Sequence, residues 1–121
     1  MILLDVNVLV GAYRSDAERH DEYREWLFAE TRSGAAFGIS EPVLVGFLRI
    51  VTHPRVFARP SPLPAAMEFA DALLALPGCR LLRAGSRYWE ILRHTCAHAD
   101  ARGNLVPDAA HAALALEHDC V

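Results

Sequence analysis

Lysine is absent from the chain, and all 12 of its cationic side chains are arginines. Without lysine, Schiff-base catalysis and the phosphate-binding lysine of P-loop enzymes are excluded. Long apolar runs are also missing. No stretch approaches the roughly 20 residues that cross a bilayer, and the apolar opening segment soon meets an acid at Asp5. We therefore expect neither a membrane span nor a signal peptide, and no membrane partner.

Cysteine is scarce, and its spacing gives no disulfide framework. The residues Cys79, Cys96 and Cys120 are odd in number and share no C-x-x-C motif. A reducing, cytoplasmic location is therefore expected. The 121 residues, 53% of them hydrophobic, predict one domain over residues 1–121. A chain of this size buries a core of its own without disulfide or metal cross-links.

Short apolar runs alternate with stretches of helical periodicity along the chain. Asn7 is predicted to cap a helix that starts at Val8, and the preceding run includes Val6. Such alternation favours an α/β fold with one parallel sheet. The expected strands are 2–4, 36–39 and 80–82, with the start of another at 119–121; the further helices are 17–31, 42–51, 64–76, 87–101 and 109–117, and 55–63 is a loop.

Three acids, Asp5, Glu41 and Asp108, stand where strands give way to helices or where helices start. In a parallel sheet the carboxyl ends of the strands open into one crevice, so these side chains are expected to converge. Protonation or a hard divalent cation would relieve their repulsion. Mg²⁺ or Mn²⁺ on such ligands can hold a phosphate and activate a water, which favours phosphodiester hydrolysis. The alternative is that each acid only caps a helix or complements its dipole.

Three segments of the chain together resemble a known family. They are Met-Ile-Leu-Leu-Asp-Val-Asn-Val-Leu-Val at the start, Ile-Ser-Glu-Pro-Val-Leu-Val-Gly-Phe-Leu-Arg-Ile-Val-Thr-His-Pro-Arg-Val-Phe in the middle, and Leu-Val-Pro-Asp-Ala-Ala-His-Ala-Ala-Leu-Ala near the end. The middle segment is the most specific, with Glu41, Phe47, Leu48, Arg49 and Pro54. In this order the segments resemble PIN-domain ribonucleases, and within them the VapC toxins of type II toxin–antitoxin systems.

The resemblance implies a PIN-like three-layer α/β/α sandwich with a central parallel sheet, and a Mg²⁺-dependent RNA endonuclease. It also implies a homodimer and a cognate VapB-type antitoxin that covers the active-site groove. Asp5, Glu41 and Asp108 match the first three acids of the family. The family has a fourth acid in a Thr-Asp-Arg-Asp-Phe-like segment after the last strand, which this sequence lacks, so that strand is expected to be incomplete. Asp119 precedes the strand and is not a replacement.

The missing acid leaves a second hypothesis open, namely a catalytically silent module that binds or sequesters the antitoxin. A third, an aspartyl-phosphate phosphatase suggested by Asp5-Val6-Asn7, lacks the second aspartate and the lysine of such enzymes. A zinc site at His94 and His98 lacks a clear third ligand.

The charge of the chain argues against broad, non-specific binding of nucleic acid, because its formal net charge is -3. Local distribution matters more than this sum. Arg49 and Arg55 are the preferred basic contacts for RNA, since both lie in the segment that resembles the family, and Asn7 is a further substrate-binding candidate. Nothing comparable marks Arg80 or Arg83. The alternative is that these arginines are solvated or paired with acids.

Overall fold

The computed structural model describes residues 1–121, which form three strands and six helices. The strands are parallel and hydrogen-bonded in the order β1-β2-β3, which confirms the predicted α/β class. In chain order the elements are β1 (Ile2–Leu3), α1 (Val6–Tyr13), α2 (His20–Arg32), β2 (Phe37–Ser40), α3 (Glu41–Val51), α4 (Leu63–Leu74), β3 (Cys79–Leu82), α5 (Tyr88–Ala99) and α6 (Leu105–Glu117).

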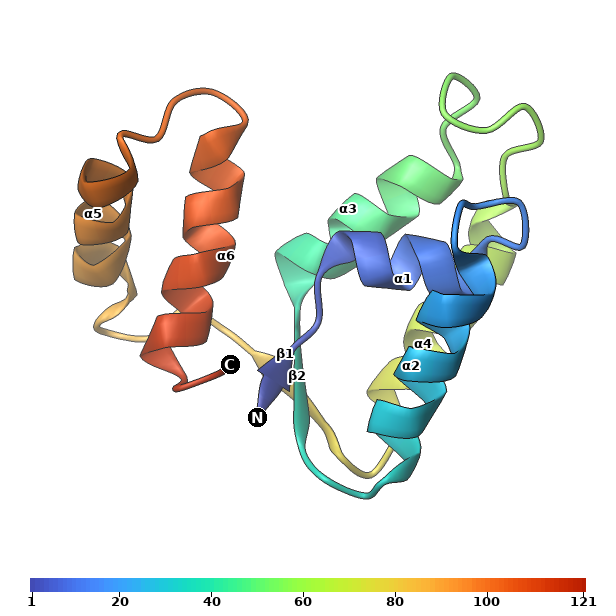
Figure 1. The fold of residues 1–121 in the computed structure, drawn as a ribbon, viewed down its shortest axis with the longest axis horizontal. Coiled ribbons are helices and arrows are strands. Elements are labelled where there is room, and N and C mark those ends of the chain that lie inside the picture. The colour runs from blue at the N-terminus through green and yellow to red at the C-terminus, as the bar shows by residue number, and fades with distance from the viewer.

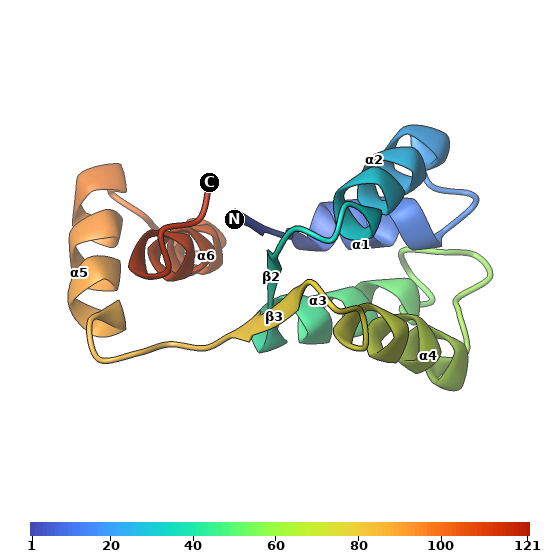
Figure 2. The ribbon, with the colours of Figure 1, turned by 90° about the horizontal axis from the view of Figure 1, so that it is seen from below.

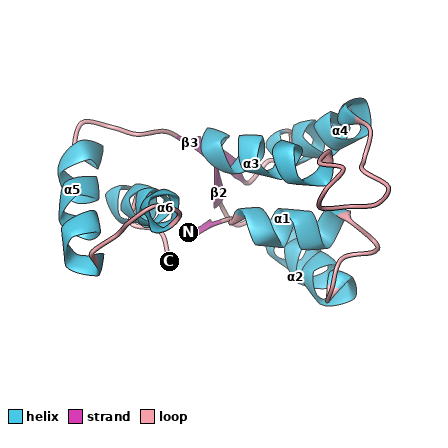
Figure 3. Ribbon diagram, turned by 90° about the horizontal axis from the view of Figure 1, so that it is seen from above, coloured by secondary structure: helices cyan, strands magenta, loops and turns pink.

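The sheet is a narrow strip between two groups of helices (Figure 1). Helices α1 to α4 lie on one side of it, and α5 and α6 pair with each other on the other side (Figure 2). Within the larger group, α1 lies beside α2 and α3 beside α4 (Figure 3). Strand β2 is central and buried along its whole length, with Gly38 opposite Leu3 of β1 and Arg80 of β3. The predicted three-layer sandwich is therefore confirmed, although the sheet is not closed.

The two helical groups differ greatly in how much core they share with the sheet. The main hydrophobic cluster has 11 buried residues and lies between the sheet and helices α1 to α4, with Phe47 and Ile39 fully buried in it. The second cluster joins α6 to the sheet through only three buried residues, Leu3, Leu82 and Leu114. Because burial of apolar area is the main stabilising term, the α5–α6 pair is the less firmly held layer.

Helices α1 and α6 begin two and four residues earlier than the sequence predicts. Helix α1 begins at Val6, because Asp5 is extended and its carboxylate accepts a hydrogen bond from the Val6 backbone. Asn7 is therefore not the cap, and Val6 is not in the strand. Helix α6 begins at Leu105, so Asp108 lies inside its first turn. The proline before Asp108 is tolerated because the first four N–H groups of a helix have no partner within it.

The C-terminal residues 119–121 do not form a strand in this structure. Asp119 has a positive φ of 54° and ends α6 in a tight turn. The backbone N–H of Val121 then donates to the carbonyl oxygen of Met1 at 2.9 Å, on the outer edge of β1. The chain thus returns to the sheet beside β1. No helix of the structure is long and apolar enough to cross a membrane.

Candidate functional site

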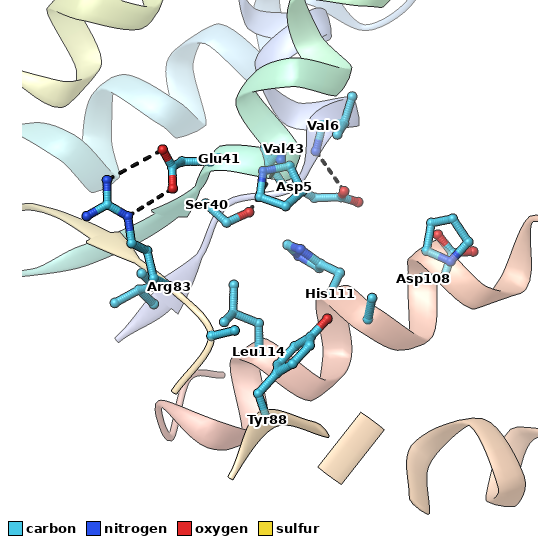
Figure 4. A pocket seen from close by; sticks show the side chains of 15 residues that line it. Asp5, Val6, Ser40, Glu41, Val43, Arg83, Tyr88, Asp108, His111 and Leu114 are labelled. Atoms are coloured by element: carbon cyan, nitrogen blue, oxygen red, sulfur yellow. Dashed lines mark hydrogen bonds and ion pairs between the residues drawn. The ribbon is translucent and has the colours of Figure 1, made fainter. Parts of the chain in front are cut away.

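A pocket of about 540 Å³ opens at the carboxyl ends of the strands, between the α1–α4 group and α6 (Figure 4). Its walls come from the starts of α1 and α3, the segment that follows β3, and the first half of α6. Asp5, Glu41 and Asp108 all line it. Asp5 and Glu41 share the cavity because each follows a strand of the parallel sheet, as expected. Asp108 follows no strand and reaches the cavity through the packing of α6.

Asp5 is held at the start of α1 by its own capping contact. Its Oδ1 accepts the backbone N–H of Val6 at 2.7 Å, and its extended backbone (φ −102°, ψ 159°) turns the chain from strand into helix. The capping alternative is thus correct for one oxygen of this acid. The other oxygen, Oδ2, makes no hydrogen bond within the protein and is open to a ligand.

Glu41 is the first residue of α3 and does not cap the helix itself. That role belongs to Ser40, which is 1% exposed and whose Oγ accepts the Val43 backbone N–H at 3.3 Å. The predicted transition from strand 36–39 through Ser40 into a helix is confirmed. With the cap provided by its neighbour, the Glu41 carboxylate is left to interact with groups at the pocket.

The partner of Glu41 is Arg83, the first residue after β3. The guanidinium donates from Nε to Oε1 at 2.9 Å and from Nη2 to Oε2 at 3.4 Å, so both carboxylate oxygens are occupied (Figure 4). These hydrogen bonds, and then the charge of Arg83, lower the pKa of Glu41, and the same contacts raise the pKa of Arg83. The two side chains are 56% and 68% exposed, respectively, so water screens the pair.

Asp108 lies across the pocket from Glu41, on α6 (Figure 4). It stands in the first turn of the helix, is exposed, and makes no hydrogen bond within the protein. His111 follows one turn later on the same helix face and extends into the pocket toward the side where Asp5 and Ser40 lie. Tyr88 forms part of the wall, and burial raises the pKa of its hydroxyl.

Sequence reasoning did not assign three of these polar residues to the site: Arg83, which was set aside in favour of Arg49 and Arg55, His111 and Tyr88. A signal for Arg83 was present, because it directly follows a strand just as Glu41 does. His111 also had one, since it is three residues after Asp108 and so shares its helix face. Tyr88 had none, because its place depends on how the segment between β3 and α5 crosses the molecule.

The three acids share a pocket, but they do not form a ready-made metal site. No group of three or more His, Cys, Asp or Glu side chains lies close enough to hold an ion. Glu41 is engaged by Arg83, and Asp108 stands on the opposite wall. The chemistry of the donors nevertheless fits Mg²⁺ or Mn²⁺, because all three offer carboxylate oxygens. The same finding applies to His94 and His98, which gather no third ligand for zinc.

The candidate RNA contacts lie outside this pocket. Asn7 is exposed in the first turn of α1, and Arg49 is exposed in the last turn of α3. At 1.5 Å per residue, Arg49 is about 12 Å along the helix from Glu41. Arg55 is exposed in the loop beyond α3. None of the three therefore shares a wall with the acids.

The comparisons with known proteins cover nearly the whole chain. The model of the PIN domain matches residues 2–121. Ribonuclease VapC43 of Mycobacterium tuberculosis is 42% identical over 119 residues, which are 98% of this chain and 81% of the relative. Ribonuclease VapC25 of the same organism is 39% identical over 120 residues, covering 99% and 84%. Ribonuclease VapC37 is 33% identical over 118 residues, covering 98% and 82%.

These matches agree with the parallel sheet of the structure. A family model that spans almost the entire chain leaves little sequence outside the shared fold. Identities of 33–42% over at least 98% of the chain then distinguish one branch of the family. We conclude that the chain belongs to the PIN-domain family and, within it, to the VapC ribonucleases.

Proposed function

We propose that this protein is a Mg²⁺-dependent RNA endonuclease that acts as the toxin of a VapBC-type toxin–antitoxin pair. One observation carries the proposal: Asp5, Glu41 and Asp108, from three separate elements, line one pocket at the carboxyl end of the sheet. Membership in the VapC branch supports the substrate class, because the relatives are named ribonucleases. All-oxygen donors support the choice of Mg²⁺, with Mn²⁺ as a substitute.

Each acid has a distinct part in this proposal. Asp5 and Asp108 would hold the ion through oxygens that have no partner in the protein, and the capping contact to Val6 fixes the orientation of Asp5. Glu41 would hold a second ion or orient the attacking water. A bound divalent ion lowers the pKa of water and neutralises charge on the phosphate. Tyr88, which is half-buried, forms part of the wall of the same pocket.

The proposed contacts with the rest of the RNA come from exposed groups beyond the pocket. Arg49 and Arg55 contact phosphates that flank the cleaved one, because they lie too far along α3 and its following loop to reach the same phosphate as Glu41. Asn7, exposed in the first turn of α1, contacts the RNA outside the pocket. In this proposal the contacts with the flanking phosphates, which do not depend on the base sequence, lie outside the pocket that holds the three acids.

The proposal also specifies partners and location. As a toxin, the protein binds a cognate VapB-type antitoxin that covers the groove, and it assembles as a homodimer. It acts in the cytoplasm, where RNA is available and where the three cysteines, all free in the structure, remain reduced.

The first prediction concerns Asp5→Asn and Asp108→Asn. Each change removes a charged oxygen ligand and keeps the size of the side chain, so we expect metal-dependent RNA cleavage to fall about a hundredfold or more. Even outer partners of metal ligands typically contribute 10- to 100-fold. A fluorogenic RNA assay with Mg²⁺, repeated with EDTA, measures the effect, and Asp16→Asn, whose carboxylate pairs with Arg14, is the matched control. Full activity in either ligand variant would refute the assignment.

A second candidate function is a module that binds the antitoxin without cleaving RNA. The observation that favours it is the absence of a three-acid group close enough for an ion, with Glu41 paired to Arg83. Calorimetry with the purified antitoxin, beside the cleavage assay, separates the two functions. Tight binding without cleavage at saturating Mg²⁺ supports the module, whereas cleavage that depends on Asp5 and Asp108 rejects it.

A further inference from the structure

The ion pair between Arg83 and Glu41 is the feature of the pocket that the proposed reaction does not use. Its two contacts match the two ends of the guanidinium edge to the two carboxylate oxygens, in the bidentate geometry typical of arginine. A carboxylate held in this way presents no free oxygen of full negative charge to an incoming cation. Arg83 and a metal ion therefore compete for the same two atoms.

The backbone of Arg83 is fixed by hydrogen bonds to the end of α6. Its carbonyl oxygen accepts a hydrogen bond from Nε2 of His118 at 2.8 Å. Glu117 accepts the backbone N–H groups of Gly85 and Arg87 at 2.8 and 3.0 Å, and its side chain is only 8% exposed. The segment that carries Arg83 is thus tied to the end of α6 by three hydrogen bonds.

The ion pair between Arg83 and Glu41 forms in this structure but is weak enough for a cation to replace Arg83 at Glu41. Both side chains are more than half exposed, and ion pairs in water contribute little to stability. A divalent ion carries twice the charge of the guanidinium. Asp5 and Asp108 line the same pocket, but in this structure the three acids are not close enough to hold one ion together. Exchange of Arg83 for a metal ion at Glu41 therefore requires breaking only an exposed ion pair, whose contribution to stability is small.

We propose that Arg83 is an internal competitor for the metal: it occupies Glu41 in the metal-free protein and must leave this carboxylate before Glu41 can take part in the metal centre. This inference rests on the proposed function, because it requires the acids of the pocket to bind a divalent ion. Arg83 is thereby a residue that sets the metal affinity of the site through Glu41, and it is not itself a ligand.

The experiment measures binding of Mn²⁺ alone, without RNA, by the loss of the free-ion signal in electron paramagnetic resonance. Arg83→Gln removes the guanidinium, so the dissociation constant for Mn²⁺ should fall about two- to fivefold, the range typical of an exposed ion pair. Arg80→Gln is the matched control. Arg80 carries the same charge, lies on β3, and donates only to the carbonyl oxygens of Pro77 and Cys79.

A double-mutant cycle tests whether the effect passes through Glu41. In the Glu41→Gln background the Arg83→Gln change should no longer increase Mn²⁺ affinity, because no carboxylate remains to be released. Far-ultraviolet circular dichroism checks that each variant is folded. Equal affinities of Arg83→Gln and Arg80→Gln, weaker binding by Arg83→Gln, or a gain that persists in the Glu41→Gln background would each overturn the inference.

The same titration distinguishes failure of this inference from failure of the proposed function. Asp108→Asn should weaken Mn²⁺ binding in the presence or absence of Arg83. If Asp108→Asn has no effect, the proposed metal centre is wrong and the inference is wrong with it. If Asp108→Asn weakens binding while Arg83→Gln behaves like Arg80→Gln, the centre stands and only the competitor role of Arg83 is refuted.

Discussion

At the scale of single residues, the site depends on how each acid is partnered before any ligand arrives. Asp5 uses one oxygen to start α1, Asp108 uses none, and Glu41 uses both on Arg83. The three acids were equivalent in the sequence, where each preceded or opened a helix. The structure makes them different, because a cap satisfies a neighbouring N–H whereas an ion pair neutralises the charge. Glu41 is therefore the only one of the three acids whose negative charge is balanced by a positively charged side chain within the protein.

A prediction about acid stability follows from the lowered pKa of Glu41. A carboxyl group with a folded-state pKa below its ordinary value of 4.5 stabilises the fold above that value, and this contribution is lost as the pH falls through the lowered pKa. Arg83→Gln should therefore reduce the melting temperature slightly at neutral pH. The difference from the unmodified protein should fade on acidification through this window.

Thermal melts followed by circular dichroism across the acid range measure this difference. Arg80→Gln serves again as the control, since Arg80 has no carboxylate partner and should show no such window. If the melting temperatures of Arg83→Gln and the unmodified protein differ by the same amount until all carboxyl groups are protonated, the result contradicts the claim that the stabilisation comes from the Arg83–Glu41 pair.

At the scale of elements, α5 is a helix whose start is organised by another helix. It has no buried residue, and its N-cap position, Arg87, offers no side-chain cap. The carboxylate of Glu117, at the end of α6, accepts the N–H groups of Gly85 and Arg87 instead. A negative charge at a helix N-terminus also interacts favourably with the helix dipole. The Glu117 side chain therefore connects the end of α6 to the start of α5 through two hydrogen bonds.

We predict that Glu117→Ala lowers the free energy of unfolding by about 0.5–2 kcal/mol, the range typical of a lost side-chain cap, because the hydrogen bonds to Gly85 and Arg87 are exposed and water can replace them in part. Glu117→Gln keeps one carbonyl oxygen as an acceptor, so its free energy of unfolding should lie between those of the unmodified protein and the alanine variant. Chemical denaturation gives the free energy, and hydrogen exchange at Gly85 and Arg87 reports the local effect. Unchanged exchange at both amides in the alanine variant would show that Glu117 does not hold this segment.

At the scale of the whole molecule, the layers on the two sides of the sheet are unequally secured. Helices α1 to α4 share 11 buried residues with the sheet, and the α5–α6 pair is joined to it through three. Asp108 and His111 stand on the weaker layer, whereas Asp5 and Glu41 stand on the stronger one. The width of the pocket therefore depends on how the α5–α6 pair sits against the sheet.

We predict that the α5–α6 pair opens before the rest of the protein unfolds. Native-state hydrogen exchange should show lower protection for amides of α5 and α6 than for those of β2 and α3, because local opening exposes less apolar area than global unfolding. Saturating Mn²⁺ should raise protection in α6, since an ion bound by Asp108 and Asp5 links the two layers. Equal protection throughout the chain would contradict this division.

Much of the architecture followed from local patterns in the sequence. Strands 36–39 and 80–82 and the helix at 42–51 are present within a residue or two of their expected bounds. Ser40 caps α3 as its residue type and position indicated. The starts of α1 and α6 were misplaced by two to four residues. A capping aspartate and a proline in the first turn compete with simpler signals there, and the local sequence does not show which one prevails.

The sequence by itself determined the family and the parallel sheet and indicated the three acids that line one pocket, because hydrophobic periodicity and short motifs are properties of short segments. Only the tertiary structure decided which charges pair and how closely the acids approach. Glu41 and Arg83 are 42 residues apart in the chain. Their contact exists because β2 and β3 are neighbours in the sheet and the end of α6 holds the segment that follows β3. Such contacts depend on the packing of whole layers, which no short segment encodes.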